Sequence, residues 1–575
     1  MKVSLTFFFA LLIVHGFAQN NSIMGQKDTL KLGYSTGGKI DSVDIAFSNH
    51  SSTLPGGGFS TSENILPYDF FIQNYGGGVY RNFSNWKNKR FSALPHLGFG
   101  YVFGGQATQN VIATYTQMFG SKNILNIDYN LRRGNAFLRS SDFNHHDVQL
   151  QFEHQSDFYS FDIRGQFVSR SIFENGGILT DTLLDISGLS FAPVRKSAAE
   201  SRYKGTRIEL DHYFDLLSKD SSNSTGVYVE NRLNIQNRRY FEVDSFAAIY
   251  PVTYYSLDST NDQYQVSELV NLAGLYYSRK GFYFKAGIQN NWWNFYNLGN
   301  YVSQSEINLD GKIGIILKGV ELKNHSNLNF IGAKGEWFSN SDVKFGWNNF
   351  LLQGKANLSY LLPEPYQRLY FGNNIFYNNS FSDLEKQFRM NIDANLDYSF
   401  QQHSVGFYIK NAVATNNYWF YNDEWRNDTL TTLNAFSLGV RGKTSYKIIH
   451  FSFNGSFNNS NWMPDFLFQS RLYLQGKILK GRKLLGQFGV EGSYHTGYNL
   501  IEVNPLMDIY RLSNTSNYST ANLHVFGAFE VQNFRFFFRV ENLGYFWNPS
   551  INRIAVDYPI PAMQIRVGIT WDFFN

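Results

Sequence analysis

Charged side chains recur at every second position in many short segments of this 575-residue chain. Because successive side chains of a β-strand point to opposite faces, this spacing places charges on one face and apolar residues on the other. The charged residues that we expect to line a polar inner surface are Asp128, Arg132, Arg207, Glu209, Arg389, Asp393, Arg471, Arg535, Arg539 and Arg566. Their chemistry would be electrostatic, since rings of charged side chains select ions in pores. A ladder of paired charges that only hydrates the wall is the other interpretation.

No motif of an enzyme accompanies these charges. Two glycine–serine segments, 58–60 and 188–190, lack the glycine that completes a nucleophile elbow, and neither a His-Glu-x-x-His motif nor a Walker loop occurs. His145 and His146 are adjacent, so on a strand they would face opposite sides and could not bind one metal ion together. The chain has no cysteine and a net charge of +4. We therefore expect no enzymatic activity, no cofactor and no nucleic-acid partner.

The C-terminal segment shows most clearly which element carries the charges. Residues 563–573 alternate without a break, with Ile565, Val567 and Trp571 on one face and Arg566 on the other. About 9–11 tilted residues are what a β-strand needs to cross a bilayer. A barrel strand spends half of its residues on the polar lumen, so a mean hydropathy of -0.31 does not argue against a membrane protein. The aromatic content of 18% suits the two interface girdles of such a barrel.

Short turns alternate with long connections along the chain. The short turns are expected at 120–123, 156–157, 279–281, 401–402, 480–482 and 532–533, and the long connections at 133–146, 171–204, 241–261, 291–303, 413–431, 495–518 and 543–561. This segregation is typical of outer-membrane barrels, which have short periplasmic turns and long extracellular loops. Counting less clear cases, about ten short turns predict an all-β, transmembrane antiparallel β-barrel of about 22 strands, within a range of 18–24.

The chain divides into three expected parts. Residues 1–18 have a basic start, an apolar run and small residues before a cleavage site, which predicts a signal peptide and export. Residues 19–95 form a loop-rich segment that would lie in the periplasm or in the lumen, and residues 96–575 would form the barrel.

The connection at 171–204 is the longest one expected from the sequence. It begins with Glu174, followed by Gly176 and Gly177, which would supply positive φ in a turn. This connection could form a simple turn. The more specific interpretation is a constriction loop that folds into the lumen. The charged residues that would narrow the pore in the second case are Glu174, Asp181, Asp185, Arg195 and Lys196.

One stretch of the chain, residues 71–183, resembles a known family. The resemblance rests on Ile72-Gln73-Asn74-Tyr75-Gly76, on Arg132-Arg133-Gly134 and on Glu174-Asn175-Gly176-Gly177-Ile178. These segments are similar to the putative porin family of Bacteroidota, which are large single-chain outer-membrane barrels, and the similarity extends over most of the mature chain. The resemblance implies passive diffusion, while the substrates of the family are largely unassigned.

Three functions are compatible with the sequence. The favoured one is a porin in the outer membrane of a Gram-negative bacterium, monomeric or homotrimeric, that passes small hydrophilic solutes. Its other partners would be membrane lipid, lipopolysaccharide and the barrel assembly machinery. A non-conducting surface, adhesion or envelope-assembly barrel is the first alternative. A gated outer-membrane transporter is the second, although residues 19–95 do not resemble a large plug domain.

The alternation of short and long connections predicts the orientation of the barrel. With no native cysteine to interfere, Ser187→Cys in a long connection should react with a membrane-impermeant thiol reagent on intact cells. Gln401→Cys in a short turn should react only after the outer membrane is permeabilised. Labelling of Gln401→Cys alone on intact cells would show that the orientation is reversed.

Overall fold

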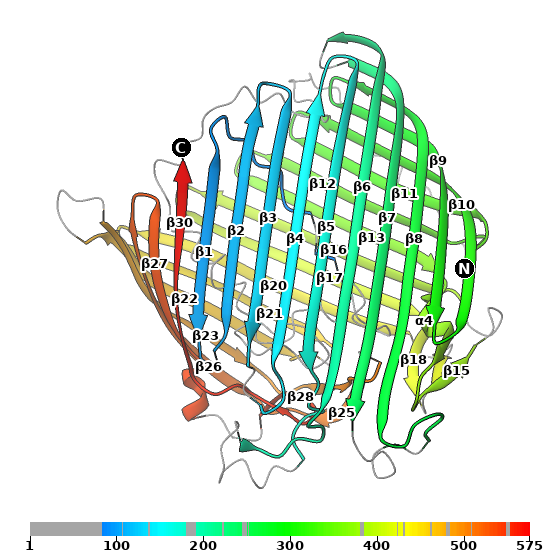
Figure 1. Cartoon of the computed structure of the whole chain (residues 1–575). Helices are drawn as coiled ribbons and strands as arrows, with labels where there is room; N and C mark the ends of the chain where they lie inside the picture. Colours follow the sequence, from blue (N-terminus) through cyan, green and yellow to red (C-terminus); the bar gives the residue numbers. More distant parts are fainter. Residues whose placement is uncertain are drawn as a thin grey trace.

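Twenty-two antiparallel strands of the described residues close into one barrel (Figure 1). The computed structural model describes residues 83–84, 86–105, 107–135, 138–179, 191–220, 223–243, 250, 252–379, 385–421, 424–428, 432–460, 463–478, 484–507, 509–547 and 552–574. Each strand pairs with the next one along the chain, and the last strand pairs with the first, which confirms the predicted barrel and its strand number.

The strands of the wall are β1 (His96–Gly104), β2 (Gln109–Phe119), β3 (Asn123–Gly134), β4 (Phe143–Gln155), β5 (Tyr159–Phe173), β6 (Ala199–Asp220), β7 (Asn223–Val243), β8 (Ser259–Arg279), β9 (Phe282–Asn297), β10 (Asn300–Leu317), β11 (Val320–Ile331), β12 (Trp337–Trp347), β13 (Phe350–Leu361), β16 (Gln387–Phe400), β17 (His403–Thr415), β20 (Leu433–Tyr446), β21 (Ile449–Asn459), β22 (Phe466–Lys477), β23 (Leu484–His495), β26 (Thr520–Val531), β27 (Phe534–Glu541) and β30 (Gln564–Phe574).

The outer face of the wall is apolar because the period-two pattern of the sequence matches the pleat of the strands. In β16 the side chain of Leu396 is 42% exposed, and in β30 that of Ile565 is 57% exposed. Large exposed apolar side chains of this kind occur on strands all around the barrel, and a surface of this extent marks contact with lipid. The intervening positions, such as Arg566 and Asp393, point to the inside. No helix among the described residues is long and apolar enough to cross a membrane.

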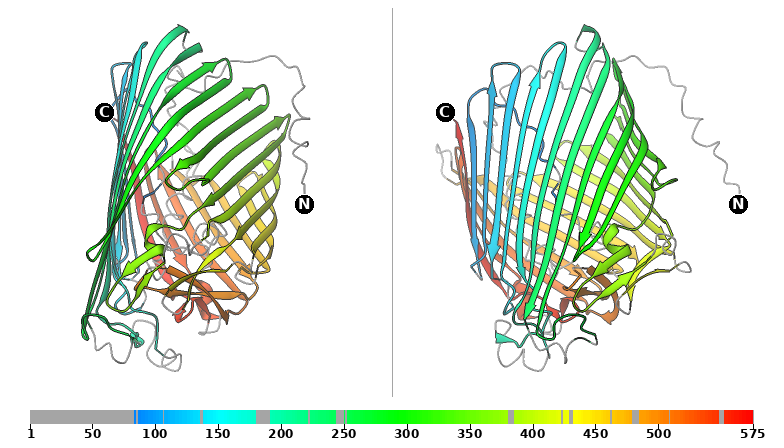
Figure 2. Two further views of the ribbon diagram at one scale, coloured as in Figure 1. Left: turned by 90° about the vertical axis from the view of Figure 1, so that its right-hand side faces the viewer. Right: turned by 45° about the vertical axis from the view of Figure 1, so that its right-hand side comes forward.

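The wall is uneven in height. β6, β7 and β8 have 22, 21 and 21 residues, whereas β27 has only 8. A strand needs about 9–11 residues to cross the bilayer, so the long strands extend well beyond it. Figure 2 shows this tall part of the wall, formed by β5 to β10, opposite the lower wall of β21 to β27.

The long connections all lie at one end of the barrel, as predicted, with two errors in their positions. The strand bounds leave ten connections of two to six residues at one end, which is the upper end in Figure 1. The expected long connection at 291–303 is wrong, because β9 and β10 are joined by a tight turn at Leu298 and Gly299. A long connection at residues 362–386 was not expected, and it spans as many residues as the one between β5 and β6.

One patch of the outer face is polar and satisfies its own hydrogen bonds. Asn324 on β11 donates to Ser339 and Ser341 on β12, at 2.9 Å each, and accepts from Ser326 at 2.9 Å. Lipid offers no hydrogen-bond partner, so polar groups on this face must pair with one another.

Adjacent residues of β16 test the assignment of the two faces. Leu396→Arg would place a charge against lipid, at a cost of roughly 2–4 kcal/mol near the midplane. Asn395→Arg, one residue away on the inner face, should be tolerated. We expect the first variant to lose insertion, measured by heat-modifiable mobility of the purified barrel, and the second to keep it. Equal insertion of both variants would contradict the face assignment.

Candidate functional site

The charged residues that the sequence predicts on a polar face lie on the inner face of the wall. Five of the predicted arginines form ion pairs with acidic residues there: Arg207–Glu209, Arg471–Glu491, Arg535–Glu530 at 2.6 Å, Arg539–Glu491 at 2.6 Å and Arg566–Glu541 at 2.7 Å. The side chain of Arg539 is only 3% exposed. These contacts support the paired-wall interpretation for β6 and for β22 to β30, and a role of these arginines in ion selectivity stays a prediction.

The other predicted wall residues lie on two different parts of the inner face. Arg132 is on β3, near the long-loop end, whereas Arg389 and Asp393 are on β16. The strand register places Asp393 directly opposite Lys355 of β13 on one side and Lys410 of β17 on the other. Asp393 is therefore part of a longer row of charges on this wall.

Asp128 does not face open lumen, because residues 83–84 and 86–95, here called the luminal segment, lie against the inner face of β2 to β6. Arg90 of this segment binds both carboxylate oxygens of Asp128, at 2.8 and 3.1 Å. Lys89 bridges Glu153 at 2.6 Å and Asp162 at 2.7 Å. The acidic inner wall is thus neutralised by a basic stretch of the chain itself.

Polar contacts continue along the luminal segment. The hydroxyl of Ser84 donates to Asp147 at 2.6 Å, and the backbone N–H and C=O of Lys87 bind the amides of Gln149 and Gln151, each at 3.0 Å. Trp86 lies near two guanidinium groups, with ring-centroid distances of 5.6 Å to Arg164 and 5.1 Å to Arg207. Because the segment binds the wall through its backbone and through charges, it covers this inner face as an added layer.

The connection between β5 and β6 does fold inward at its described ends. Gly176 and Gly177 have φ of 68° and 85°, as the glycine turn requires, and a Cβ on Gly177 would come within 2.7 Å of Asp557. Glu174 is buried. Arg195 pairs with Asp557 at 2.9 Å. Asp181 and Asp185 lie outside the described residues.

Lys196, the last of the predicted constriction residues, is buried in a pair with Glu242 at 2.7 Å, and it also donates to the hydroxyl of Tyr250. The described charges of this connection therefore attach the loop to β7 and to the connection between β27 and β30. Their contacts are structural, and their predicted effect on permeation stays a prediction.

Long connections from several sides of the barrel meet in one apolar cluster, here called the mouth cluster. Its buried members are Leu138, Ile178, Ala192, Ala435, Met463, Ile501, Ile554, Ala555 and Tyr558. Ala435 belongs to the wall strand β20, whereas Leu138 follows β3, which lies almost half of the ring away. The loops therefore reach across the mouth toward the facing wall.

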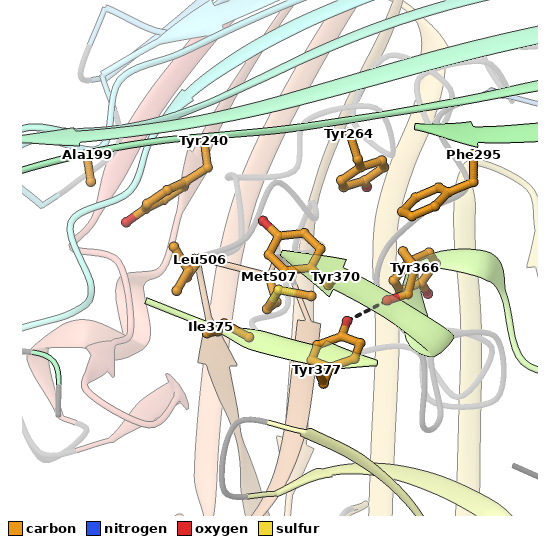
Figure 3. Close-up of a cluster of buried hydrophobic side chains, with 10 residues drawn as sticks. All are labelled: Ala199, Tyr240, Tyr264, Phe295, Tyr366, Tyr370, Ile375, Tyr377, Leu506 and Met507. Atoms are coloured by element: carbon orange, nitrogen blue, oxygen red, sulfur yellow. Dashed lines mark hydrogen bonds between the residues drawn. The ribbon is translucent and has the colours of Figure 1, made fainter. Parts of the chain in front are cut away.

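The connection between β23 and β26 crosses the lumen to β7, which is about half of the ring away in either direction. Arg238 of β7, only 1% exposed, donates to the backbone oxygens of Pro505 and Leu506, at 2.8 Å each. Leu506 and Met507 pack beside Tyr240 in a second apolar cluster (Figure 3). A buried arginine and an apolar contact thus fix this loop to the facing wall.

The connection between β13 and β16 completes this second cluster. It contains α4 (Pro365–Arg368), β14 (Leu369–Phe371) and β15 (Phe376–Asn378). Its Tyr366, Tyr370 and Tyr377 lie against the inward Tyr264 and Phe295 of β8 and β9 (Figure 3).

Asn373, fully buried between β14 and β15, joins that connection to the one before β8. Its side-chain oxygen accepts from the backbone N–H groups of Tyr255 and Ser256, at 3.0 and 2.9 Å, and its amide nitrogen donates to the Ser256 oxygen at 2.7 Å. Such a fully satisfied buried amide fixes the relative position of the two loops.

The connection between β13 and β16 begins at Leu362, whose backbone N–H binds the carboxyl group of Glu336, and this carboxyl group has a shifted pKa. Burial raises the pKa of Glu336, in the turn between β11 and β12, to about 7, although a hydrogen bond from the Leu362 N–H at 2.6 Å acts in the opposite direction. The stability that this group contributes is present below its ordinary pKa of 4.5 and is lost as pH rises through about 7. Burial of this carboxyl group is therefore favoured at acidic pH.

The sequence did not reveal the residues that attach the luminal segment and the loops. Lys89 and Arg90 stand in a stretch without strand periodicity. Arg238 stands directly beside the exposed Arg239, and nothing in the local sequence distinguishes the two. The two prolines of residues 363–365 are a signal for a loop with a helix start, because proline fits the first helical turn. No group of three or more His, Asp or Glu side chains within the described part of the chain could hold a metal ion.

The fold and its two faces define a large transmembrane β-barrel with a charged, loop-covered lumen. Residues 28–575 match the family model described as "Putative porin", and the chain belongs to this family. Comparison with curated proteins gives no match.

Solved structures show the same fold at low sequence identity. The siderophore receptor PirA from Acinetobacter baumannii has a TM-score of 0.59 at 8% identity, over 84% of this chain and 81% of that one. A mutant of the ferric enterobactin receptor PfeA from Pseudomonas aeruginosa has a TM-score of 0.59 at 10% identity, over 84% and 81%. The FrpB iron transporter from Neisseria meningitidis has a TM-score of 0.57 at 8% identity, over 84% and 82%.

Two adjacent arginines of β7 test whether the crossing loop narrows the lumen. Arg238→Gln leaves the carbonyls of Pro505 and Leu506 without their buried donor, and each unsatisfied group costs about 1–3 kcal/mol. We expect the loop to detach, the single-channel conductance to rise and protease cleavage near residue 506 to increase. Arg239→Gln, on the exposed outer face, should change neither measurement. Equal behaviour of the two variants would show that Arg238 does not hold the loop in place.

Proposed function

We propose that this protein is a porin through which small hydrophilic solutes diffuse without an energy source. The observation that carries the proposal is the inner face of β11 to β13, where the charged side chains of Lys323, Asp342 and Lys355 are exposed although they point into the barrel. An exposed, charged inner wall behind an apolar outer wall is the surface that a water-filled path needs. The family membership of the chain agrees with it.

The remaining features of the proposal concern location and assembly. The protein would be exported with a cleaved signal peptide and inserted into the outer membrane of a Gram-negative bacterium by the barrel assembly machinery. It would contact membrane lipid and lipopolysaccharide, act as a monomer or a homotrimer, and carry out no enzymatic reaction. The apolar outer face supports the membrane location, since it matches the lipid-facing surface of such barrels.

A gated transporter is the second candidate, and one observation favours it. The long-loop end is crossed by loops that bind the facing wall through Arg238 and through two apolar clusters. Some proteins with the same fold are named as siderophore receptors or iron transporters. In that case the lumen would open only when a ligand or an energy-coupling partner displaces the loops.

Reconstitution in planar lipid bilayers separates the candidates. A passive porin should give stepwise, persistent conductance in salt alone, without a ligand or an energised partner. A gated transporter, like a non-conducting adhesion or assembly barrel, should leave the bilayer silent. Silence of the wild-type protein together with large steps of Arg238→Gln would support the gated transporter and overturn passive diffusion.

A further inference from the structure

The charged wall residues of β11 to β17 form a row of alternating sign. The strand register places Lys323 opposite Asp342, Asp342 opposite Lys355, Lys355 opposite Asp393, and Asp393 opposite Lys410. Directly opposite residues on one face have Cβ atoms about 4.5–5.5 Å apart. The row, here called the charge row, therefore alternates in sign across five neighbouring strands, with facing Cβ atoms about 5 Å apart.

Three members of the charge row are exposed, unlike the ion pairs on the other side of the barrel. The side chain of Lys323 is 49% exposed, and Asp342 and Lys355 also belong to the exposed residues. On the opposite wall the side chains of Arg566 and Glu541 are only 7% and 4% exposed. A solute that moves through the lumen can therefore contact the charge row, whereas the buried pairs are covered.

Alternation of sign continues on the same wall nearer to the short turns. Glu321 of β11 pairs with Lys323 and, at 3.5 Å, with Lys344 of β12. Asp397 of β16 pairs with Arg441 of β20 at 2.7 Å, across the intervening strand β17. Gly406 of β17 lies under this pair, and a Cβ at that position would overlap the carboxylate of Asp397. The wall thus keeps positive and negative groups side by side along its height.

Such a wall acts on solutes by contact and not at long range. The fields of neighbouring opposite charges largely cancel at distances greater than their separation. Salt screens the remainder within roughly 8 Å at physiological ionic strength, so the row attracts neither cations nor anions strongly from a distance. A small molecule that carries both an ammonium and a carboxylate can bind two neighbouring residues of the row at once. Exposed ion pairs are weak, about 0.2–1 kcal/mol, which allows binding and release during passage.

We propose that the charge row makes this barrel a channel for small zwitterionic solutes, of the class of amino acids and short peptides. The inference rests on the proposed passive porin function and adds its solute class. It assigns Asp342 and Lys355 as residues that determine specificity, because they are neighbours in the row and both are exposed.

Liposome swelling with two solutes of equal length tests the inference. The probes are 4-aminobutanoate, which is a zwitterion, and 4-hydroxybutanamide, which is neutral. We expect the zwitterion to enter wild-type proteoliposomes faster than the amide. In the variant Asp342→Asn/Lys355→Gln, which keeps the net charge, the ratio of the two rates should fall about two- to fivefold, as expected for weak exposed ion pairs. The rate of the amide should stay the same.

A second pair of substitutions serves as the matched control. Lys122→Gln/Asp157→Asn also removes one charge of each sign, from exposed positions in short turns, and should leave the ratio unchanged. If the first variant fails to insert, Lys323→Gln/Asp342→Asn removes the neighbouring pair and should give the same fall. An unchanged ratio in the row variants, or no preference in the wild type, would overturn the inference. Failure of both solutes to enter would overturn the porin function itself.

Discussion

Closure of the sheet is the constraint on which the rest of this structure depends. Hydrocarbon offers no hydrogen-bond partner to a strand edge, so β30 must pair with β1 along its length. Once the wall is closed, every strand has one face toward lipid and one toward the lumen. The period-two pattern then decides the position of each side chain: Leu396 and Ile565 meet lipid, while Asp393 and Arg566 point inward. A charged side chain on the lipid face would destabilise the barrel by more free energy than most single interactions in it contribute.

A closed barrel of 22 strands has too wide an interior to be filled by wall side chains alone, and the chain covers its inner face in three ways. Arginines and carboxylates on β22 to β30 pair with one another, as Arg539 does with Glu491. The basic luminal segment covers the acidic wall of β2 to β6, and the long connections pack against the tall wall at the mouth. The inner face of β11 to β13 keeps exposed charges, and a path for solutes would therefore run along it.

The sequence was sufficient to predict the barrel, its strand number and its two faces, because alternation is a local property that each strand carries by itself. It failed at 291–303, where the tall wall rises beyond the lipid. There the outer face of β9 carries Asn290 and Asn294 beside Trp292, so the apolar alternation that identifies a strand is lost. The partners of the charges could not be predicted either. The ion pair of Arg90 with Asp128 and the contact of Arg238 with Leu506 depend on which distant segments meet inside the closed wall, and no local pattern carries that information.

Cysteine accessibility from within the lumen tests most directly whether the path runs along β11 to β13. The chain has no native cysteine, so single cysteines can be placed at Asn357, on the exposed inner face of β13, and at Gln149, which the luminal segment covers on β4. A charged methanethiosulfonate reagent should reduce the current of Asn357→Cys channels and leave that of Gln149→Cys channels unchanged. Reaction at Gln149→Cys with a loss of current, and none at Asn357→Cys, would contradict the account.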